Sequence, residues 1–317
     1  MVFVGISFAY CLGLPFTNFR WIGLVCALIP CLCSFLMIFC KESPVYLLSK
    51  GKFNEAVEAL QFFRGKYSDT SGELESIRNS LEESFSRKAK LSDLKRSYNL
   101  KPFLMALGLM VLQQFLGINA VTFNLASIFE KAGSDLSPSI SSIIIGLTQV
   151  GGTIVGSLLM DRAGRKPLLI ISVSFMIVSI AALGLFFFFL ENNASVAANN
   201  GWLPLASLIL YVVAYAIGCG PIPWLMMGEL FSPEIKEIAG SIVTMSNWTS
   251  AFITTLMFQP LQMVIHDYGV YWMFCGFCIM KLVFCILYVY ETKGKTLQEI
   301  SAYFGKLQPL SEMASQE

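Results

Sequence analysis

Four neutral amide side chains lie close together in one uncharged stretch of this 317-residue sequence. Gln113 and Gln114 are adjacent, Asn119 follows five residues after Gln114, and Asn124 ends the group. A side-chain amide offers both a hydrogen-bond donor and an acceptor and carries no charge. This chemistry suits a neutral ligand with many hydroxyl groups, and Gly117 would loosen a helix between the amides. The alternative is hydrogen bonding between helices, which Gln and Asn also provide.

Two further amides lie among apolar residues later in the chain. Gln149 is followed by small residues that allow close helix packing, and Asn247 is next to Trp248. An indole beside an amide can stack on the apolar face of a ring-shaped ligand, or it can simply fill a gap between helices. On its own, the stretch around Gln149 favours helix packing.

A second motif predicts a broken helix. Gly218 and Gly220 are followed by Pro221, Pro223 and Trp224. Proline has no backbone N–H to donate, so two prolines this close interrupt the hydrogen bonds of a helix. In a membrane such a break occurs where protein or a water-filled cavity surrounds the backbone, and it therefore predicts a gate or a binding site.

Opposite charges occur in two short loops that we expect on the same side of the membrane. Asp161, Arg162 and Arg165 lie in one loop, and Glu229 lies in the other. A preference for basic residues on the cytoplasmic side explains the arginines but not Glu229. We therefore expect an ion-paired latch that closes this side of the protein.

The composition excludes most soluble proteins. Hydrophobic residues make up 55% of the chain, charged residues only 14%, and the mean hydropathy is +0.65. With a net charge of +1 the chain has no charge excess for nucleic acid. No nucleophile is paired with a base, the single histidine, His266, lies at the end of a predicted span, and no residue spacing is typical of a metal or cofactor site. We therefore predict a protein of the lipid bilayer that is not an enzyme and needs no cofactor.

Long uncharged runs predict an all-α transmembrane bundle. Crossing a bilayer takes about 20 mainly apolar residues, and runs this long without alternating polarity favour helices over a barrel. The first stretch, 1–19, is short for a full span and looks cut off; a cleavable signal peptide is the alternative. The nine cysteines nearly all lie inside spans and are expected to be small buried apolar residues. The other spans are expected at 21–40, 102–129, 136–160, 167–190, 201–228, 238–265 and 268–290, the last interrupted by Lys281.

Basic residues predict the orientation. Residues 41–101 hold 12 Lys or Arg and 9 Asp or Glu, and they form a soluble insertion with short amphipathic helices at 54–63, capped by Asn54, and 71–86. Counting loops alternately gives 19 basic residues on the side of this insertion and 2 on the other. The insertion and the C-terminus are therefore expected in the cytoplasm, which leaves Asn193 as an external glycosylation site.

The expected domains are a remnant bundle at 1–40, the linker at 41–100, a six-helix bundle at 101–292 and a tail at 293–317. Secondary transporters often consist of two halves with the substrate between them. The chain has one complete half of this kind and the last one to two helices of another.

The motifs together resemble the sugar porter family of the major facilitator superfamily, over almost the whole chain. Each one is weak alone, but seven in the same order and spacing are specific. The subgroup they are most similar to is the facilitated trehalose and glucose transporters of arthropods. The motifs occupy residues 41–48 (KESPVYLL), 113–121 (QQFLGINAV), 161–166 (DRAGRK), 218–224 (GCGPIPW), 229–231 (ELF), 246–249 (SNWT) and 291–296 (ETKGKT).

The resemblance implies a function and a role for each of these residues. The protein would be a plasma-membrane facilitator that carries a neutral sugar by alternating access. Glu229 would pair with Arg162 or Arg165. Sugar hydroxyls would bind Gln113, Gln114, Asn119, Gln149 and Asn247, with Trp224 and Trp248 lining the cavity.

Some residues depart from the family pattern. Asn124 stands where a gating Tyr is common, Ala216 stands where many glucose facilitators have Glu, and Lys281 lies inside the last span. The resemblance implies that the first four helices of the family and part of the fifth are missing from this sequence. A chain with one half cannot rock, so two alternatives remain: a sugar-binding or regulatory protein that associates with an intact transporter, or a non-functional fragment.

Overall fold

The computed structural model describes residues 2–13, 18–65, 71–86, 91–133 and 137–305. Every regular element in these ranges is a helix, which confirms the all-α prediction. The chain forms two compact units, one made of Met1–Pro15 with Leu91–Glu317 and the other of Phe16–Lys90. The domain boundaries that the sequence suggests at 40, 100 and 292 stay predictions.

The described residues of the second unit form four helices, two of which correspond to the expected amphipathic helices. Asn54 does not cap its helix as expected: the N-cap is Lys52, whose side chain makes no capping hydrogen bond, so Asn54 lies in the first turn. A small apolar core joins α3, α4 and α5 around Leu47, Leu60 and Leu74, whereas α2 buries none of its residues. The helices are α2 (Phe19–Met37), α3 (Pro44–Ser49), α4 (Phe53–Arg64) and α5 (Ser71–Ser86).

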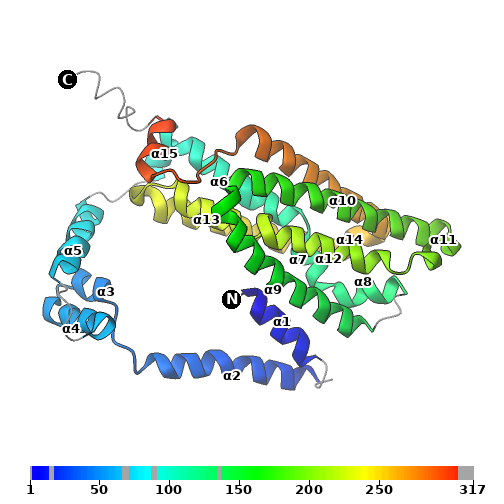
Figure 1. Ribbon diagram of the computed structural model, residues 1–317, viewed down its shortest axis with the longest axis horizontal. Helices are drawn as coiled ribbons and strands as arrows, with labels where there is room; N and C mark the ends of the chain where they lie inside the picture. The colour runs from blue at the N-terminus through cyan, green and yellow to red at the C-terminus, as the bar shows by residue number, and fades with distance from the viewer. Residues whose placement is uncertain (1, 14–17, 66–70, 87–90, 134–136, 306–317) are drawn as a thin grey trace. The chain divides into compact units, whose positions relative to one another are not determined.

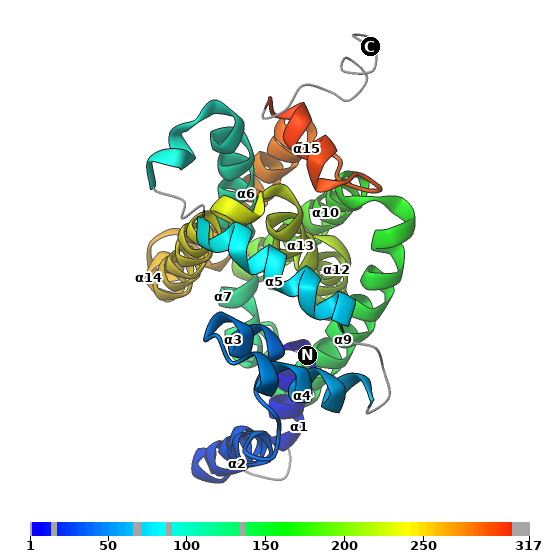
Figure 2. The same ribbon diagram turned by 90° about the vertical axis from the view of Figure 1, so that its left-hand side faces the viewer.

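The first unit is a bundle in which the long helices run side by side (Figure 1) and are seen nearly end-on in Figure 2. Helix α10 packs against α12 and α14, and α14 also packs along α6. The elements are α1 (Val2–Leu12), η1 (Leu91–Lys95), α6 (Ser97–Phe115), α7 (Ile118–Phe123), α8 (Leu125–Lys131), α9 (Pro138–Ala163), α10 (Arg165–Asn192), α11 (Ala194–Asn199), α12 (Leu203–Ala214), the π-helix η2 (Tyr215–Cys219), α13 (Pro221–Leu230), α14 (Pro233–Tyr288) and α15 (Leu297–Tyr303).

Six helical segments of the described chain are long and apolar enough to cross a membrane. One of them, Glu234–Tyr288, has 55 residues and covers two expected spans, since the backbone leaves the helical conformation at His266. The segments therefore match the expected spans from residue 19 onward. Helix α1 has 11 residues and, at about 1.5 Å per residue, is shorter than a bilayer core. It packs on α9, and its Tyr10 hydroxyl donates to the Thr122 carbonyl oxygen at 3.0 Å.

The expected span at 102–129 consists of three helices, with breaks at Gly117 and Asn124. Gly117 separates α6 from α7 and has φ +87°, a conformation that L residues with a side chain rarely adopt. A Cβ atom at this position would also lie 2.5 Å from the ring of Phe274. Gly117 therefore allows the helix to end directly after the amide pair, with α7 continuing from the break.

The cysteines do not all behave as expected. Cys219, Cys278 and Cys285 are buried in the bundle. The expectation is wrong for the exposed cysteines of α1, α2 and the segment after α2, and α2 as a whole buries none of its residues. The exposed cysteines are Cys11, Cys31, Cys33 and Cys40.

His266 has strained backbone geometry that can be tested. Its φ of 62° and ψ of 169° lie in a region that is occupied almost only by glycine, at a cost of about 1–3 kcal/mol. The ring nitrogen Nδ1 lies 2.7 Å from Glu191 Oε1, and exposed pairs of this kind contribute about 0–1 kcal/mol. We expect His266→Gly to stabilise the protein by about 1 kcal/mol, measured as a rise in melting temperature in lipid nanodiscs.

His266→Ala is the matched control for this prediction. Alanine removes the same ring and its contact with Glu191 but keeps a Cβ atom in the strained conformation. The alanine variant should therefore be no more stable than the original protein. Equal melting temperatures for the two variants would contradict the assignment of strain to His266.

Candidate functional site

The amides of α6, α7 and α14 form one hydrogen-bonded network. Gln114 Nε2 donates to Asn247 Oδ1 at 3.0 Å, and Asn119 Nδ2 donates to Gln114 Oε1 at 2.8 Å. Asn247 Nδ2 donates to Gln113 Oε1 at 3.1 Å. Gln113 and Asn247 are fully buried, and Asn119 is half-buried. We call these four residues the amide network.

The amide network is bonded directly to the broken helix. Gln113 Nε2 donates to the carbonyl oxygens of Cys219 at 2.7 Å and Gly220 at 2.9 Å. In a regular helix the Cys219 carbonyl would accept from the N–H of residue 223, but Pro223 has none. Gln113 therefore satisfies a backbone acceptor that the proline leaves free.

The break itself takes the form of a π-helix followed by a new α-helix. The Gly220 N–H donates to the Tyr215 carbonyl at 2.7 Å, an i to i+5 bond, and α13 starts at Pro221. The hydroxyl of Ser172 on α10 donates to the Ala214 carbonyl at 2.6 Å and accepts from the Cys219 N–H at 3.0 Å. Single π-helical turns are often found at functional sites. In a membrane their unpaired backbone groups need hydrogen-bond partners from other helices, which Ser172 provides here.

Small residues let neighbouring helices approach the π-helix. A Cβ atom on Gly218 would lie 2.8 Å from the Leu168 carbonyl oxygen of α10. On the other side, a Cβ on Gly156 of α9 would lie 2.7 Å from Ile217 Cα. The backbone at the break is therefore held closely from two sides.

The remaining expected binding residues lie outside the network. Gln149 is buried, but its side chain makes no hydrogen bond to the network in the described part of the chain. Trp224 is 37% exposed and Trp248 is 62% exposed, although each is adjacent in sequence to a residue of the break or of the network. Asn124 donates to the Ala120 carbonyl at 2.8 Å, within the short turn between α7 and α8.

A charged cluster lies at the ends of α9, α10 and α13. Arg165 Nη2 donates to Glu229 Oε1 at 3.0 Å, and Asp161 Oδ1 is 4.0 Å from the same nitrogen. Thr292 Oγ1 donates to Glu229 Oε2 at 2.5 Å. Among the described residues Arg162 is exposed and forms no ion pair, so the structure pairs Glu229 with Arg165.

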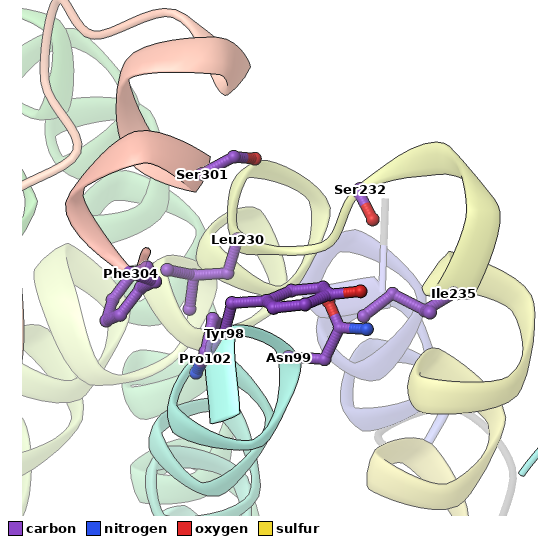
Figure 3. A pocket seen from close by; sticks show the side chains of 8 residues that line it. All are labelled: Tyr98, Asn99, Pro102, Leu230, Ser232, Ile235, Ser301 and Phe304. Atoms are coloured by element: carbon purple, nitrogen blue, oxygen red, sulfur yellow. The ribbon is translucent and has the colours of Figure 1, made fainter. Parts of the chain in front are cut away.

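Figure 3 shows a separate small pocket where α6, α13, α14 and α15 meet. Tyr98 and Asn99 line it from the first turn of α6, and Phe304 closes it from the segment after α15. Tyr98 precedes Gln113 by fifteen residues, which is about 22 Å along a helix. The pocket is therefore distant from the amide network.

Comparison with known proteins identifies the family. A family model described as "Sugar (and other) transporter" matches residues 1–304. The chain belongs to the sugar transporter family. It is 39% identical to "Facilitated trehalose transporter Tret1" of Polypedilum vanderplanki over 98% of this chain and 62% of that protein. It is 41% identical to the protein of the same name from Culex quinquefasciatus, over 88% and 54%.

Solved structures show the same fold. The proton:xylose symporter XylE bound to 6-bromo-6-deoxy-D-glucose superposes with a TM-score of 0.67 at 26% identity, over 89% of this chain and 58% of that chain. The inward-open conformation of XylE from E. coli gives a TM-score of 0.74 at 23% identity. This sugar transporter chain therefore has the major facilitator fold of a multi-pass membrane protein. It spans 62% and 54% of the length of the two Tret1 relatives.

Two contributors to the site of this sugar transporter chain were missed from the sequence. Ser172 had no local signal, because serines are common in membrane helices and its partners are more than 40 residues away. For Glu291 the sequence did contain a local signal, since this residue is the first charged residue after the last span and begins the ETKGKT motif. Its acceptor role depends on backbone groups of α10.

The carboxylate of Glu291 caps the N-terminus of α10. It accepts from the backbone N–H groups of Arg165 at 3.0 Å, Lys166 at 2.9 Å and Lys293 at 2.9 Å. Burial raises the pKa of Glu291, but these three backbone donors and the Arg165 charge outweigh it, so the pKa lies below its usual value of 4.5. A Cβ atom on Gly164 would lie 2.9 Å from this carboxylate.

The lowered pKa predicts a pH-dependent contribution to stability. The ionised form of Glu291 is favoured in the folded protein, so its contribution is present above pH 4.5 and is lost as the pH falls through the lower folded value. We expect Glu291→Gln to lower the thermal stability at pH 7 by about 1 kcal/mol, a capping value reduced for partial exposure. Melting curves in nanodiscs at pH 7 and pH 4 measure the change.

The control for this prediction is Glu130→Gln, which changes an exposed carboxylate outside the cluster. The difference between Glu291→Gln and the original protein should shrink at pH 4, whereas Glu130→Gln should differ little at either pH. A difference for Glu291→Gln that stays constant with pH would rule out the capping role of its charge.

Proposed function

We propose that this chain provides the sugar-binding bundle and cytoplasmic latch of a facilitative transporter for a hexose or trehalose. The relatives named as facilitated trehalose transporters support this substrate class. The proposal covers the transport cycle of a two-half protein, to which this chain contributes the six spans from α6 to α14. Alternating access by rocking of one half against the other is the expected mechanism.

The observation that carries the proposal is the bond from the amide network to the broken helix. Gln113 joins Asn247 on one side and the carbonyls of Cys219 and Gly220 on the other. A ligand that rearranges the amide network would therefore change the hydrogen bonds that Gln113 donates at the helix break. Buried polar groups at such a break are typical of substrate sites in secondary transporters.

The neutral character of the network fits reversible binding of a sugar. Hydroxyl groups of a sugar would replace bonds such as Gln114 to Asn247 and Asn119 to Gln114, exchanging amide–amide for amide–hydroxyl hydrogen bonds. The net energy of such an exchange is small, because each bond lost is matched by a similar one. Trp224 and Trp248 would stack on the sugar ring, and Gln149 would contribute a further amide from α9.

The arrangement also suggests how binding is coupled to gating. Asn119 lies on α7, beyond the break at Gly117, and bonds to Gln114 on α6. Sugar that competes for Gln114 would release α7, with Asn124 at its end, on the external side. At the other end, the Arg165 to Glu229 ion pair, supported by Asp161, would act as the cytoplasmic latch.

Topology follows from the same proposal. The linker helices α3 to α5 and helix α15 would lie in the cytoplasm, and the loop after α10 would lie outside the cell. Asn193 in this loop is exposed, and its side chain accepts from Ser195 Oγ at 2.9 Å. Expression in insect cells should give a glycosidase-sensitive mass shift that Asn193→Gln removes; an unchanged mass would contradict this orientation.

The test of function measures binding before transport. The 317-residue chain in lipid nanodiscs is titrated with radiolabelled trehalose and glucose, with sorbitol as the competitor that lacks a ring. We expect saturable binding of one of the two sugars. The chain is then placed in liposomes alone and together with the N-terminal spans of the Polypedilum relative.

The outcomes separate the proposal from its alternatives. Binding in both preparations with uptake only in the second supports a transporter bundle. Binding without uptake in either favours a sugar sensor or a regulatory partner of an intact transporter. Absence of binding to correctly folded protein contradicts the proposal and favours a non-functional fragment.

A further inference from the structure

Lys281 is a fully buried lysine within a membrane-spanning helix. It lies seven residues before Tyr288, the last residue of α14, which is about 10 Å along the helix. The segments 102–129, 136–160, 167–190, 201–228, 238–265 and 268–290 contain no Asp or Glu. Among the ion pairs of the described chain none involves Lys281, so a carboxylate partner does not explain its position.

The side chain lies on the face of α14 that packs along α6. The residues before and after it on this face mark the contact: the rings of Phe277 and Phe115 are 5.1 Å apart. The Phe284 ring lies where a Cβ atom on Gly108 would be. Lys281 thus occupies a packing position between two phenylalanines, where an apolar residue would be expected.

Its nitrogen reaches the backbone of α6 instead of the membrane surface. Lys281 Nζ is 3.5 Å from the Leu109 carbonyl oxygen, a long hydrogen bond. The next carbonyl, that of Met110, accepts from Asn247 Nδ2 at 2.8 Å. Two adjacent carbonyls of α6 therefore receive side-chain donors from α14, one from each side of the break at His266.

These two carbonyls belong to the helical turn that holds the amide pair. In an α-helix the carbonyl of residue i accepts from the N–H of residue i+4. Leu109 is therefore paired with Gln113 and Met110 with Gln114. A donor that holds carbonyls 109 and 110 sets the position of the turn from which both glutamine side chains project.

We propose that Lys281 is a positioning residue for sugar recognition, which holds the α6 turn below Gln113 and Gln114 through the Leu109 carbonyl. This inference rests on the proposed sugar-binding role of the amide network. Asn247 belongs to the network itself, whereas Lys281 lies outside it and acts only through the backbone of α6. A lysine side chain keeps N–H donors in either protonation state, so the role does not depend on its charge.

The proposal predicts that binding and stability change in opposite directions. Burial of a lysine nitrogen with one long hydrogen bond is costly, and methionine has a similar length and no polar group. Lys281→Met should therefore be at least as thermally stable as the original protein. Its sugar affinity should nevertheless fall by up to roughly tenfold, which is the upper end of the net contribution of a single hydrogen bond.

The experiment uses the full chain in nanodiscs with three proteins: the original, Lys281→Met and Lys281→Arg. Equilibrium binding of radiolabelled trehalose and glucose gives the affinity, and melting curves give the stability. Lys281→Arg keeps N–H donors at this position and should recover most of the affinity. If Lys281 had only a structural role, Lys281→Met would lower the stability and the sugar affinity together. Lys281→Arg would then restore the affinity only as far as it restores the stability.

A second measurement does not need sugar binding. Amide hydrogen exchange of the segment 109–116 reports the stability of the α6 turn directly, and we expect roughly tenfold faster exchange in Lys281→Met. Unchanged affinity together with unchanged exchange would overturn the role of Lys281. If the original protein binds no sugar but the exchange of this segment is still faster in Lys281→Met, the contact of Lys281 with the α6 turn is supported and the proposed sugar-binding function is contradicted.

Discussion

Replacing Gln113 with alanine is expected to weaken sugar binding strongly and to destabilise the protein. The change removes the donor to the Cys219 and Gly220 carbonyls and the acceptor for Asn247. Buried groups left without a partner cost about 1–3 kcal/mol each, so we expect a loss of roughly 2–4 kcal/mol in thermal stability. Sugar affinity should fall at least about tenfold, since the network loses one of its four members.

A matched control separates the effect of Gln113→Ala from the general effect of removing a glutamine side chain. Gln259 lies in α14, the helix that carries Asn247, and its side chain is exposed. Gln259→Ala should leave binding and the melting temperature nearly unchanged, whereas Asn247→Ala should resemble Gln113→Ala. Full sugar binding in folded Gln113→Ala protein would show that the amide network is structural and not part of the site.

Replacing Gly156 with alanine is expected to have the second largest effect, through packing alone. The added Cβ would lie 2.7 Å from Ile217 Cα, 2.8 Å from the Ile217 carbonyl oxygen and 3.0 Å from the Ala216 carbonyl oxygen. These are backbone atoms of the π-helix, which cannot rotate away as a flexible side chain can. Overpacking of this kind costs about 1–3 kcal/mol, and it should also displace the carbonyls to which Gln113 donates.

Gly151 provides the matched control, because it lies on the same helix and a Cβ there would meet no atom within 4 Å. Gly151→Ala should change the thermal stability by less than about 0.5 kcal/mol. Melting curves and sugar binding of the two variants measure the contrast. Equal stability of Gly156→Ala and Gly151→Ala would mean that α9 does not support the broken helix.

Much of the local structure follows from the order of residues. Charged side chains are costly in the bilayer, so uncharged runs reveal the spans, and the two prolines after Gly220 predict the interruption that appears as a π-helix. The grouping of Gln113, Gln114 and Asn119 near Gly117 is also visible in the sequence. These features depend on neighbours within one or two helical turns, which a single sequence contains.

The partners of these residues could not be predicted, since they come from distant parts of the chain. Gln113 meets Cys219 from 106 residues away, and Glu291 meets the N–H of Arg165 from 126 residues away. Gln149, an amide of the same kind in a similar environment, makes no bond to the network among the described residues. Only the packing of helices decides between these cases, because sequence spacing says nothing about which helix faces which.

The amino-acid sequence alone determined that this protein is a helical membrane protein, where its helices break, and which neutral amides are available for hydroxyl groups. Those properties follow from the cost of charge in lipid, the missing N–H of proline and the chemistry of the amide. The tertiary structure decided that Gln113 completes the broken helix, that Arg165 and not Arg162 pairs with Glu229, and that Lys281 lies against α6. Each of these results depends on a hydrogen bond between separate helices, whose directional geometry exists only once the bundle is packed.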